Sequence, residues 1–230
     1  MRKKTALAAL AVLGFLLACG GSALAEGGKP RLAVVALGVN DWANSMSASG
    51  GTYAGTFIDG AMTDLLARSE KAFSADFQVK PAESFASDPA FLALSIGKLK
   101  DGLYGPIIQG KNLPSFSEDK KEVIRGALKD GVAEKLCALL GVDRVVLIYT
   151  EWTVATGGFV PISRALAKNC VAVYSSDGKL RFFDRKDVQG SRAIGGMGRV
   201  VLNAETIGYW VEAFERGLLD ILKENRKKML

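Results

Sequence analysis

Apolar residues in the first third of the chain alternate between a continuous run and helical spacing. Residues 31–39 (RLAVVALGV) form an apolar run rich in Val, which is typical of a buried strand. Between residues 57 and 66 the apolar positions recur at helical spacing, and a short strand is predicted at 77–80. The pattern therefore predicts strand, helix and strand, in that order.

Two helices are predicted in the middle of the chain. The Asp88-Pro89 pair suits the N-cap and first position of a helix that continues over residues 90–99. Residues 101–117 are rich in Gly and Pro and predict a long loop. A longer helix follows, because Ser117 is a suitable N-cap, apolar residues recur at helical spacing, and Gly141 favours a helix end.

Strands dominate the next segment. Residues 142–153 are β-branched and aromatic, and they form the strongest strand pattern in the chain. After an apolar, Gly-containing loop at 156–163, two strands are predicted at 170–175 and 180–183. They flank Asp177-Gly178, a pair that favours a tight hairpin turn.

The chain ends in a Gly-rich loop at 189–198 and a long helix, whose apolar side chains from Ile207 to Leu222 form a one-sided stripe. The complete order is β-α-β-α-α-β-β-β-α. We therefore predict an α+β fold, with a single domain over residues 31–230 in which helices pack on a mixed β-sheet.

The N-terminal residues have the features of a secretory signal. Arg2, Lys3 and Lys4 precede an uninterrupted apolar run at residues 5–18, which is shorter than a membrane-spanning helix requires. The protein is therefore expected to be exported, and to be either soluble in the periplasm or anchored to the outer membrane by lipid.

Two cleavage sites are compatible with this signal. Residues 16–19 (LLAC) are similar to the lipobox of bacterial lipoproteins, in which residues 1–18 are removed and Cys19 is lipidated. Residues 23–25 (ALA) form an A-x-A site, which would remove residues 1–25 and leave 26–30 as a short linker. The sequence leaves both alternatives open, together with an uncleaved N-terminal anchor.

Composition removes several classes of function. The sequence contains no His, which excludes Ser-His-Asp and Cys-His catalysis and zinc sites of the H-E-x-x-H type. The formal net charge of +6 falls to +3 when Arg2, Lys3 and Lys4 are removed, which is too weak to indicate a nucleic-acid partner. The acidic residues lack the spacing of a metal-binding loop, so neither a metal nor another cofactor is expected.

Cysteine usage leaves one question open. Cys19 is lipidated or removed, so Cys137 and Cys170 remain in the folded body. Export to an oxidising compartment allows a Cys137–Cys170 disulfide. The alternative is two buried free thiols, because Cys packs as a small hydrophobic residue.

Three segments resemble a family of bacterial envelope proteins. Residues 31–35 (RLAVV) resemble the family's opening strand, residues 140–147 (LGVDRVVL) its junction of helix, Leu-Gly-Ala-Asp and strand, and residues 171–184 the hairpin that follows. The family includes the curli secretion-channel lipoproteins, the lipoprotein activators of penicillin-binding proteins and the amino-terminal domain of the Tol-system propeller protein. The resemblance implies a mixed sheet packed by helices, and binding or assembly rather than catalysis.

A catalytic alternative rests on the Ser-x-x-Lys spacing of penicillin-recognising enzymes. This spacing occurs at Ser95/Lys98, Ser117/Lys120 and Ser176/Lys179. The sequence lacks the companion Ser-Asp-Asn and Lys-Thr-Gly motifs, and the serines at 117 and 176 also suit a helix cap and a turn. A His-independent periplasmic hydrolase is therefore the alternative from the enzyme class.

Large apolar residues outside the periodic segments are candidates for a partner surface, because exposed apolar patches mark interfaces. The alternative is that these loops fold back on the core. The candidates are Trp42, Leu103, Tyr104, Ile107, Ile108, Phe159 and Ile162. The leading hypothesis is a non-catalytic envelope protein that binds another envelope protein, and the second is a subunit of a homo-oligomeric secretion or surface assembly.

Overall fold

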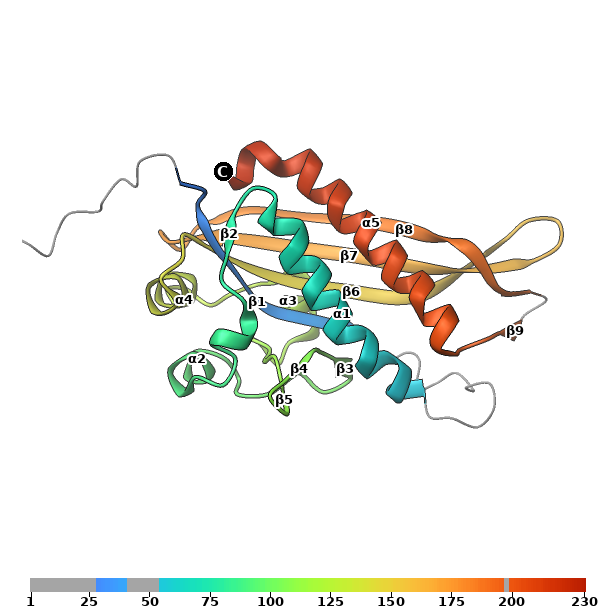
Figure 1. The fold of residues 1–230 in the computed structure, drawn as a ribbon, viewed down its shortest axis with the longest axis horizontal. Coiled ribbons are helices and arrows are strands. Elements are labelled where there is room, and N and C mark those ends of the chain that lie inside the picture. Colours follow the sequence, from blue (N-terminus) through green and yellow to red (C-terminus); the bar gives the residue numbers. More distant parts are fainter. Residues whose placement is uncertain (1–27, 41–53, 197–198) are drawn as a thin grey trace, which may run out of the picture.

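The fold is built on one mixed β-sheet with helices on both of its faces (Figure 1). The computed structural model describes residues 28–40, 54–196 and 199–230. Within them, the main sheet has the strand order β2-β1-β6-β7-β8-β9, with β3 also paired to β1, and β4 and β5 form a small second sheet. The buried hydrophobic side chains form one core cluster. The predicted α+β class, with one domain, a mixed sheet and a long C-terminal helix, is therefore confirmed.

The strands and helices have the following bounds. The strands are β1 (Arg31–Asn40), β2 (Gln78–Val79), β3 (Leu103–Tyr104), β4 (Ile107–Ile108), β5 (Lys111–Asn112), β6 (Arg144–Gly157), β7 (Ile162–Ser175), β8 (Leu180–Gly196) and β9 (Arg199–Val200). The helices are α1 (Ala54–Ser74), α2 (Pro89–Ala93), α3 (Lys120–Arg125), α4 (Val132–Leu140) and α5 (Ala204–Met229), with a 3-10 turn at Ala82–Ser84. β1 runs parallel to β2 and β6, whereas β6, β7, β8 and β9 pair antiparallel in sequence order.

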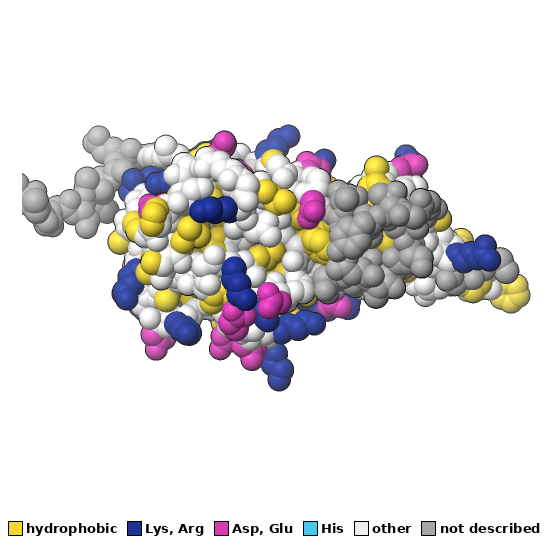
Figure 2. All heavy atoms as spheres, turned by 90° about the horizontal axis from the view of Figure 1, so that it is seen from below, with side chains coloured by type: hydrophobic (Ala, Val, Ile, Leu, Met, Phe, Trp, Pro, Cys, Tyr) yellow, Lys and Arg dark blue, Asp and Glu magenta, His cyan; other side chains and the backbone are white. Residues whose placement is uncertain are grey.

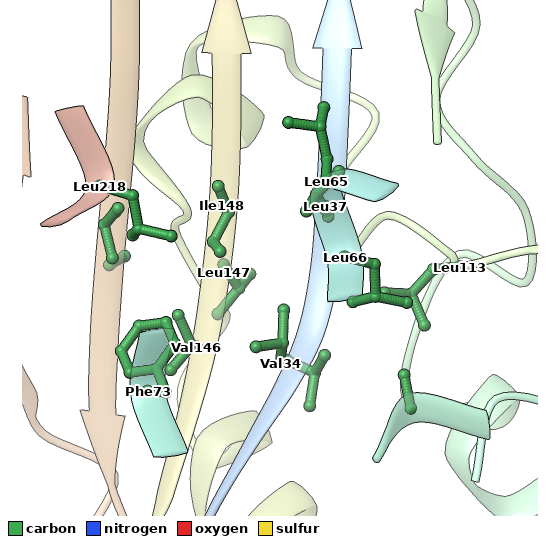
Figure 3. Close-up of a cluster of buried hydrophobic side chains, with 14 of the residues drawn as sticks. Val34, Leu37, Leu65, Leu66, Phe73, Leu113, Val146, Leu147, Ile148 and Leu218 are labelled. Atoms are coloured by element: carbon green, nitrogen blue, oxygen red, sulfur yellow. The ribbon is translucent and has the colours of Figure 1, made fainter. Parts of the chain in front are cut away.

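Helices α1 and α5 lie side by side on one face of the sheet (Figure 1). Val34 of β1 is paired with Val146 of the neighbouring strand β6, and both side chains are fully buried. Phe73 from α1 and Leu218 from α5 join them in one apolar cluster (Figure 3). Burial of this face accounts for the one-sided apolar stripe that the sequence shows in the last helix.

The approach of α5 to the sheet is closest at Gly217. A Cβ atom at this position would overlap the side-chain amide nitrogen of Asn169 and lie 3.1 Å from Val188 Cγ2. Asn169 is fully buried, its Oδ1 accepts a hydrogen bond from Thr150 Oγ1 at 2.7 Å, and its Nδ2 donates to Phe214 O at 3.3 Å. Gly is therefore needed at position 217, because any side chain would displace a buried amide that has its partners.

Helices α3 and α4 cover the opposite face. Asn169 and Ala172 are three residues apart on β7, so their side chains point to opposite faces of the sheet. Gly126, which ends α3, lies against Ala172: a Cβ on Gly126 would be 2.7 Å from Ala172 Cβ and 3.1 Å from Leu147 Cβ. This face is therefore packed around β6 and β7 near the start of β6.

The long helix predicted after Ser117 is wrong in its extent. The segment forms two helices, α3 and α4, because Gly126 adopts a left-handed conformation with φ of 56° where the chain meets the sheet. The N-cap of α3 is Asp119, whose carboxylate accepts from two backbone N–H groups, rather than Ser117. The predicted end at Gly141 is confirmed by its left-handed φ of 63°.

Two predicted loops are partly strand. β6 and β7 include half of residues 156–163 and leave a turn at 158–161, and β8 continues to Gly196 through the Gly-rich segment predicted as a loop over 189–198. The helix predicted over 90–99 is limited to α2, although Asp88 caps it as predicted, with its carboxylate accepting from Ala90 N. The loop predicted over 101–117 contains the short strands β3, β4 and β5.

The role of Gly217 leads to a paired prediction. We expect Gly217→Ala to lower the free energy of unfolding by about 1–3 kcal/mol, because the new methyl group displaces Asn169 from its buried hydrogen bonds. Gly208→Ala is the matched control in the same helix, where a Cβ has no neighbour within 4 Å. We expect this control to raise stability by up to about 1 kcal/mol through helix propensity. Urea unfolding curves measure both, and equal stability of the two variants would contradict the close approach.

Candidate docking surface at the end of the β6–β7 hairpin

Strands β6 and β7 form an uninterrupted antiparallel ladder that projects at one end of the molecule (Figure 1). All 14 residues of β6 pair with the 14 residues of β7, from Arg144 opposite Ser175 to Gly157 opposite Ile162. A turn at residues 158–161 closes the ladder, and Gly158 allows it with a φ of 99°. The turn is therefore held by the same hydrogen-bonded strands that cross the core.

Large apolar side chains are exposed at this turn. Phe159 has a relative exposure of 105%, Val160 of 61% and Ile162 of 43%. The adjacent hydroxyl groups satisfy each other, since Thr156 Oγ1 and Ser163 Oγ are 3.1 Å apart. We call residues 156–164, with the neighbouring residues 192–196 and 199–200, the hairpin end. It presents apolar side chains on a turn whose flanking strands are hydrogen-bonded to each other.

The charged side chains of the hairpin end are all positive. They are Arg164, Arg192 and Arg199, each of them exposed, and the sequence has no Asp or Glu in residues 152–166, 189–196 or 199–201. The Arg192 guanidinium lies 5.8 Å from the centre of the Tyr209 ring, and its pKa is raised by a hydrogen bond to Tyr209 and by the charges of Glu205 and Glu212. Figure 2 shows hydrophobic and basic side chains together at this extremity.

The other candidate residues do not join this surface. Leu103 and Tyr104 are half-buried in β3, where they pair with β1, and Ile108 is buried. Ile107 is exposed at 46%, but β4 lies against α1, away from the hairpin end (Figure 1). Trp42 lies outside the described residues. The six described members of the expected set are thus divided between separate places, and the sequence did not single out Val160 or the arginines.

Both cysteines of the folded body are buried free thiols, so the Cys137–Cys170 disulfide is absent from the structure. The charged neighbours of Cys137 include Asp143 and Arg144 at the start of β6, whereas Cys170 pairs with Tyr149 in the ladder. Five residues separate Arg144 from Tyr149, or about 16 Å along the strand. A disulfide requires Cα atoms within about 7 Å, so this separation along the ladder agrees with the two free thiols.

The three Ser-x-x-Lys pairs hold structural positions. Ser95 Oγ donates to Leu92 O at 2.7 Å and accepts from Gly97 N, while Lys98 forms salt bridges with Asp101 and Glu118. Ser117 Oγ accepts from Asp119 N at 2.9 Å, and Ser176 lies in the β7–β8 turn. In each pair the serine serves a turn or a helix start, and no hydrogen bond between its serine and its lysine is present among these described residues.

The expected export signal and Cys19 belong to residues 1–27, which lie outside the described residues. In the part of the chain that the structure describes, no helix is both long and apolar enough to cross a membrane. The same part contains no group of three or more Cys, Asp or Glu side chains arranged to hold a metal ion.

Comparisons with known proteins found distant structural likeness. No protein-family model and no curated protein matches the chain. Among solved structures, the hypothetical protein CT253 from Chlamydia trachomatis is similar over 88% of this chain and 98% of its own, with a TM-score of 0.44 and 12% identity. Lipoprotein GNA1162 from Neisseria meningitidis is similar over 86% of this chain and 99% of its own, with a TM-score of 0.37 and 13% identity. At these scores neither structure indicates the function of this chain.

The buried thiols lead to a prediction about alkylation. Burial raises the pKa of both Cys137 and Cys170 to about 11. Because the thiolate is the reactive form, we expect iodoacetamide at pH 8 to modify the folded protein about a hundredfold more slowly than the urea-unfolded chain. Intact mass over time measures both rates. Addition of no alkyl groups in urea without reductant would instead establish a disulfide and contradict the free thiols.

Proposed function

We propose that this protein is a non-catalytic, exported protein of the bacterial envelope that docks onto another envelope component through the hairpin end. The observation that carries the proposal is the full exposure of Phe159 at the tip of a ladder anchored in the core. Exposed apolar clusters of this kind mark interaction sites. The N-terminal secretory signal supports export, and the lipobox at Cys19 supports a lipid anchor.

The energetics of the hairpin end favour docking. Full burial of an apolar side chain such as Phe, Val or Ile contributes roughly 1.5–3 kcal/mol. Phe159, Val160 and Ile162 are exposed in the isolated protein, so much of this free energy is gained only when a partner buries them. The turn is already ordered by the β6–β7 ladder, so its association loses less conformational entropy than that of an unstructured segment.

A cysteine footprint in cells tests the docking proposal. Val160→Cys places a reactive thiol beside Phe159 without removing it, and the two buried thiols of high pKa give little background. We expect a membrane-impermeant maleimide to label this variant quickly as purified protein and slowly in cells with a permeabilised outer membrane, because the docked surface is covered. The gel shift of a polyethylene-glycol maleimide measures the labelled fraction.

Ile107→Cys is the matched control for the footprint, since Ile107 is a similarly exposed apolar residue far from the hairpin end. It should be labelled at the same rate in cells and in the purified protein. Equal labelling of the thiol at position 160 in both samples would show that the hairpin end is free in cells, and would overturn the proposal.

A second candidate function, assembly of several copies, rests on the outer edge of β8. This strand pairs with β7 along its length but with β9 only at Gly195 and Gly196. Among the described residues, the edge from Leu180 to Ala193 therefore has no strand partner. An edge of this length is a template for the addition of another strand, and its charged residues, such as Arg185 and Asp187, limit unspecific pairing.

The assembly candidate predicts a concentration-dependent mass. Light scattering should show dimers or larger species as protein concentration rises. Hydrogen exchange should slow in parallel at the backbone amides of residues 181–193 that point away from β7, because these N–H groups gain strand partners. A constant monomer mass with unchanged exchange at these amides would exclude this edge as an assembly surface.

A further inference from the structure

The hairpin end combines three properties that a membrane surface requires together. Its tip is convex and apolar, with Phe159 fully exposed, so no neighbouring element forms a wall around the ring. The charged residues within it are all arginines. Between β6 and β7 its backbone polar groups are paired through Gly157 and Ile162, and the hydroxyl groups of Thr156 and Ser163 pair with each other. Insertion of the tip therefore keeps the hydrogen bonds of this ladder intact in an apolar medium.

We propose that the hairpin end binds the surface of a membrane rich in anionic phospholipid. Phe159, Val160 and Ile162 enter the boundary between headgroups and acyl chains, and Arg164 and Arg199 lie at the level of the phosphates. This inference rests on the proposed docking function and names its partner. The ligand chemistry is an acidic phosphodiester headgroup above an apolar layer.

The observations favour a lipid surface over a protein partner. Specific protein interfaces orient their partners with hydrogen-bonding side chains around an apolar centre. At the turn, the polar side chains of Thr156 and Ser163 are already engaged with each other, and Arg164 is the charged residue nearest to it in sequence. A fluid membrane needs no such register, because lipids move to fit a convex apolar tip.

The two arginines available to phosphate differ from the third. Arg192 is placed over Tyr209 and near Glu205 and Glu212, so α5 offsets part of its charge. Among the described residues, no carboxylate oxygen lies within 4 Å of the guanidinium nitrogens of Arg164 or Arg199, so neither arginine forms a salt bridge. Their charge is therefore free to attract anionic headgroups.

Vesicle flotation tests the inference with the chain from Glu26 onward, which retains every described residue and is free of the candidate lipid anchor. We expect flotation with vesicles of equal parts phosphatidylglycerol and phosphatidylcholine, and little with phosphatidylcholine alone. Phe159→Ser should weaken binding at least about tenfold through lost apolar burial. Arg164→Gln and Arg199→Gln should each weaken it about fivefold and reduce its sensitivity to salt.

Two control variants locate the binding. Ile107→Ser removes another exposed apolar residue elsewhere, and Lys227→Gln with Lys228→Gln removes charge from the end of α5, which lies at the other end of the molecule (Figure 1). Both should float like the unmodified chain. Binding that depends on the C-terminal lysines, or that survives Phe159→Ser, would overturn the assignment to the hairpin end.

The outcomes separate this inference from the docking function. No flotation with anionic vesicles, together with protection of the thiol at position 160 in cells, would overturn the lipid inference and leave a protein as the partner. No flotation and no protection in cells would overturn both. Vesicle binding should also protect the Val160→Cys thiol from maleimide in the purified protein, and an unprotected thiol on bound protein would contradict insertion of the tip.

Discussion

The rest of the structure depends on the continuous pairing of β6 with β7. The ladder begins at Arg144 opposite Ser175, beside the first strand β1, and continues without a change of register to Gly157 opposite Ile162. Its first part is buried between the two layers of helices, and its last part extends beyond them. The turn is therefore held in place by strands that are part of the core. A separate hairpin of two strands would be only marginally stable in water.

Helix α5 determines how much of this ladder is covered. Gly217 allows the helix to reach Asn169, and Trp210, nearer its start, stacks on Trp152 with ring centroids 6.2 Å apart and donates its Nε1–H to Thr153 O at 2.8 Å. Beyond this point the side chains of the ladder become exposed, from Thr156 to Ile162. The same packing that stabilises the domain therefore defines where the free hairpin end begins.

Elements with local signals could be predicted from the sequence, whereas elements stabilised by distant partners could not. The buried strand β1, the Asp88 cap and the stripe of α5 follow from residue type and spacing. The far halves of β7 and β8 contain small residues and Gly, and they are strands because each pairs with a strand that is already in place. The break between α3 and α4 likewise comes from the contact of Gly126 with Ala172, a residue distant in sequence.

The candidate site was predicted only in part, for the same reason. Phe159 and Ile162 could be recognised because they are large apolar residues in a segment without periodicity, but Leu103 and Tyr104 have the same features and are half-buried by pairing with β1. Arg199 approaches the turn only through the pairing of β9 with β8. The charge of the hairpin end is therefore a property of the fold, since its three arginines come from three different strands, β7, β8 and β9.

The position of the hairpin end relative to the N-terminus limits how the protein can be arranged in the envelope. Leu32 lies beside Arg144 at the start of β6, and Gly157 is 13 residues farther along that strand, or about 43 Å away. A chain lipidated at Cys19 would have a tether of residues 20–30, which spans at most about 40 Å when fully extended. Because the two lengths are similar, such a chain could bring the hairpin end to its own membrane either by lying along the surface or by turning over on a nearly extended tether. A body that points away from the anchoring membrane would instead present the hairpin end to a component well removed from the anchor. In a chain beginning at Glu26, only binding at the hairpin end would determine the position of the protein in the envelope.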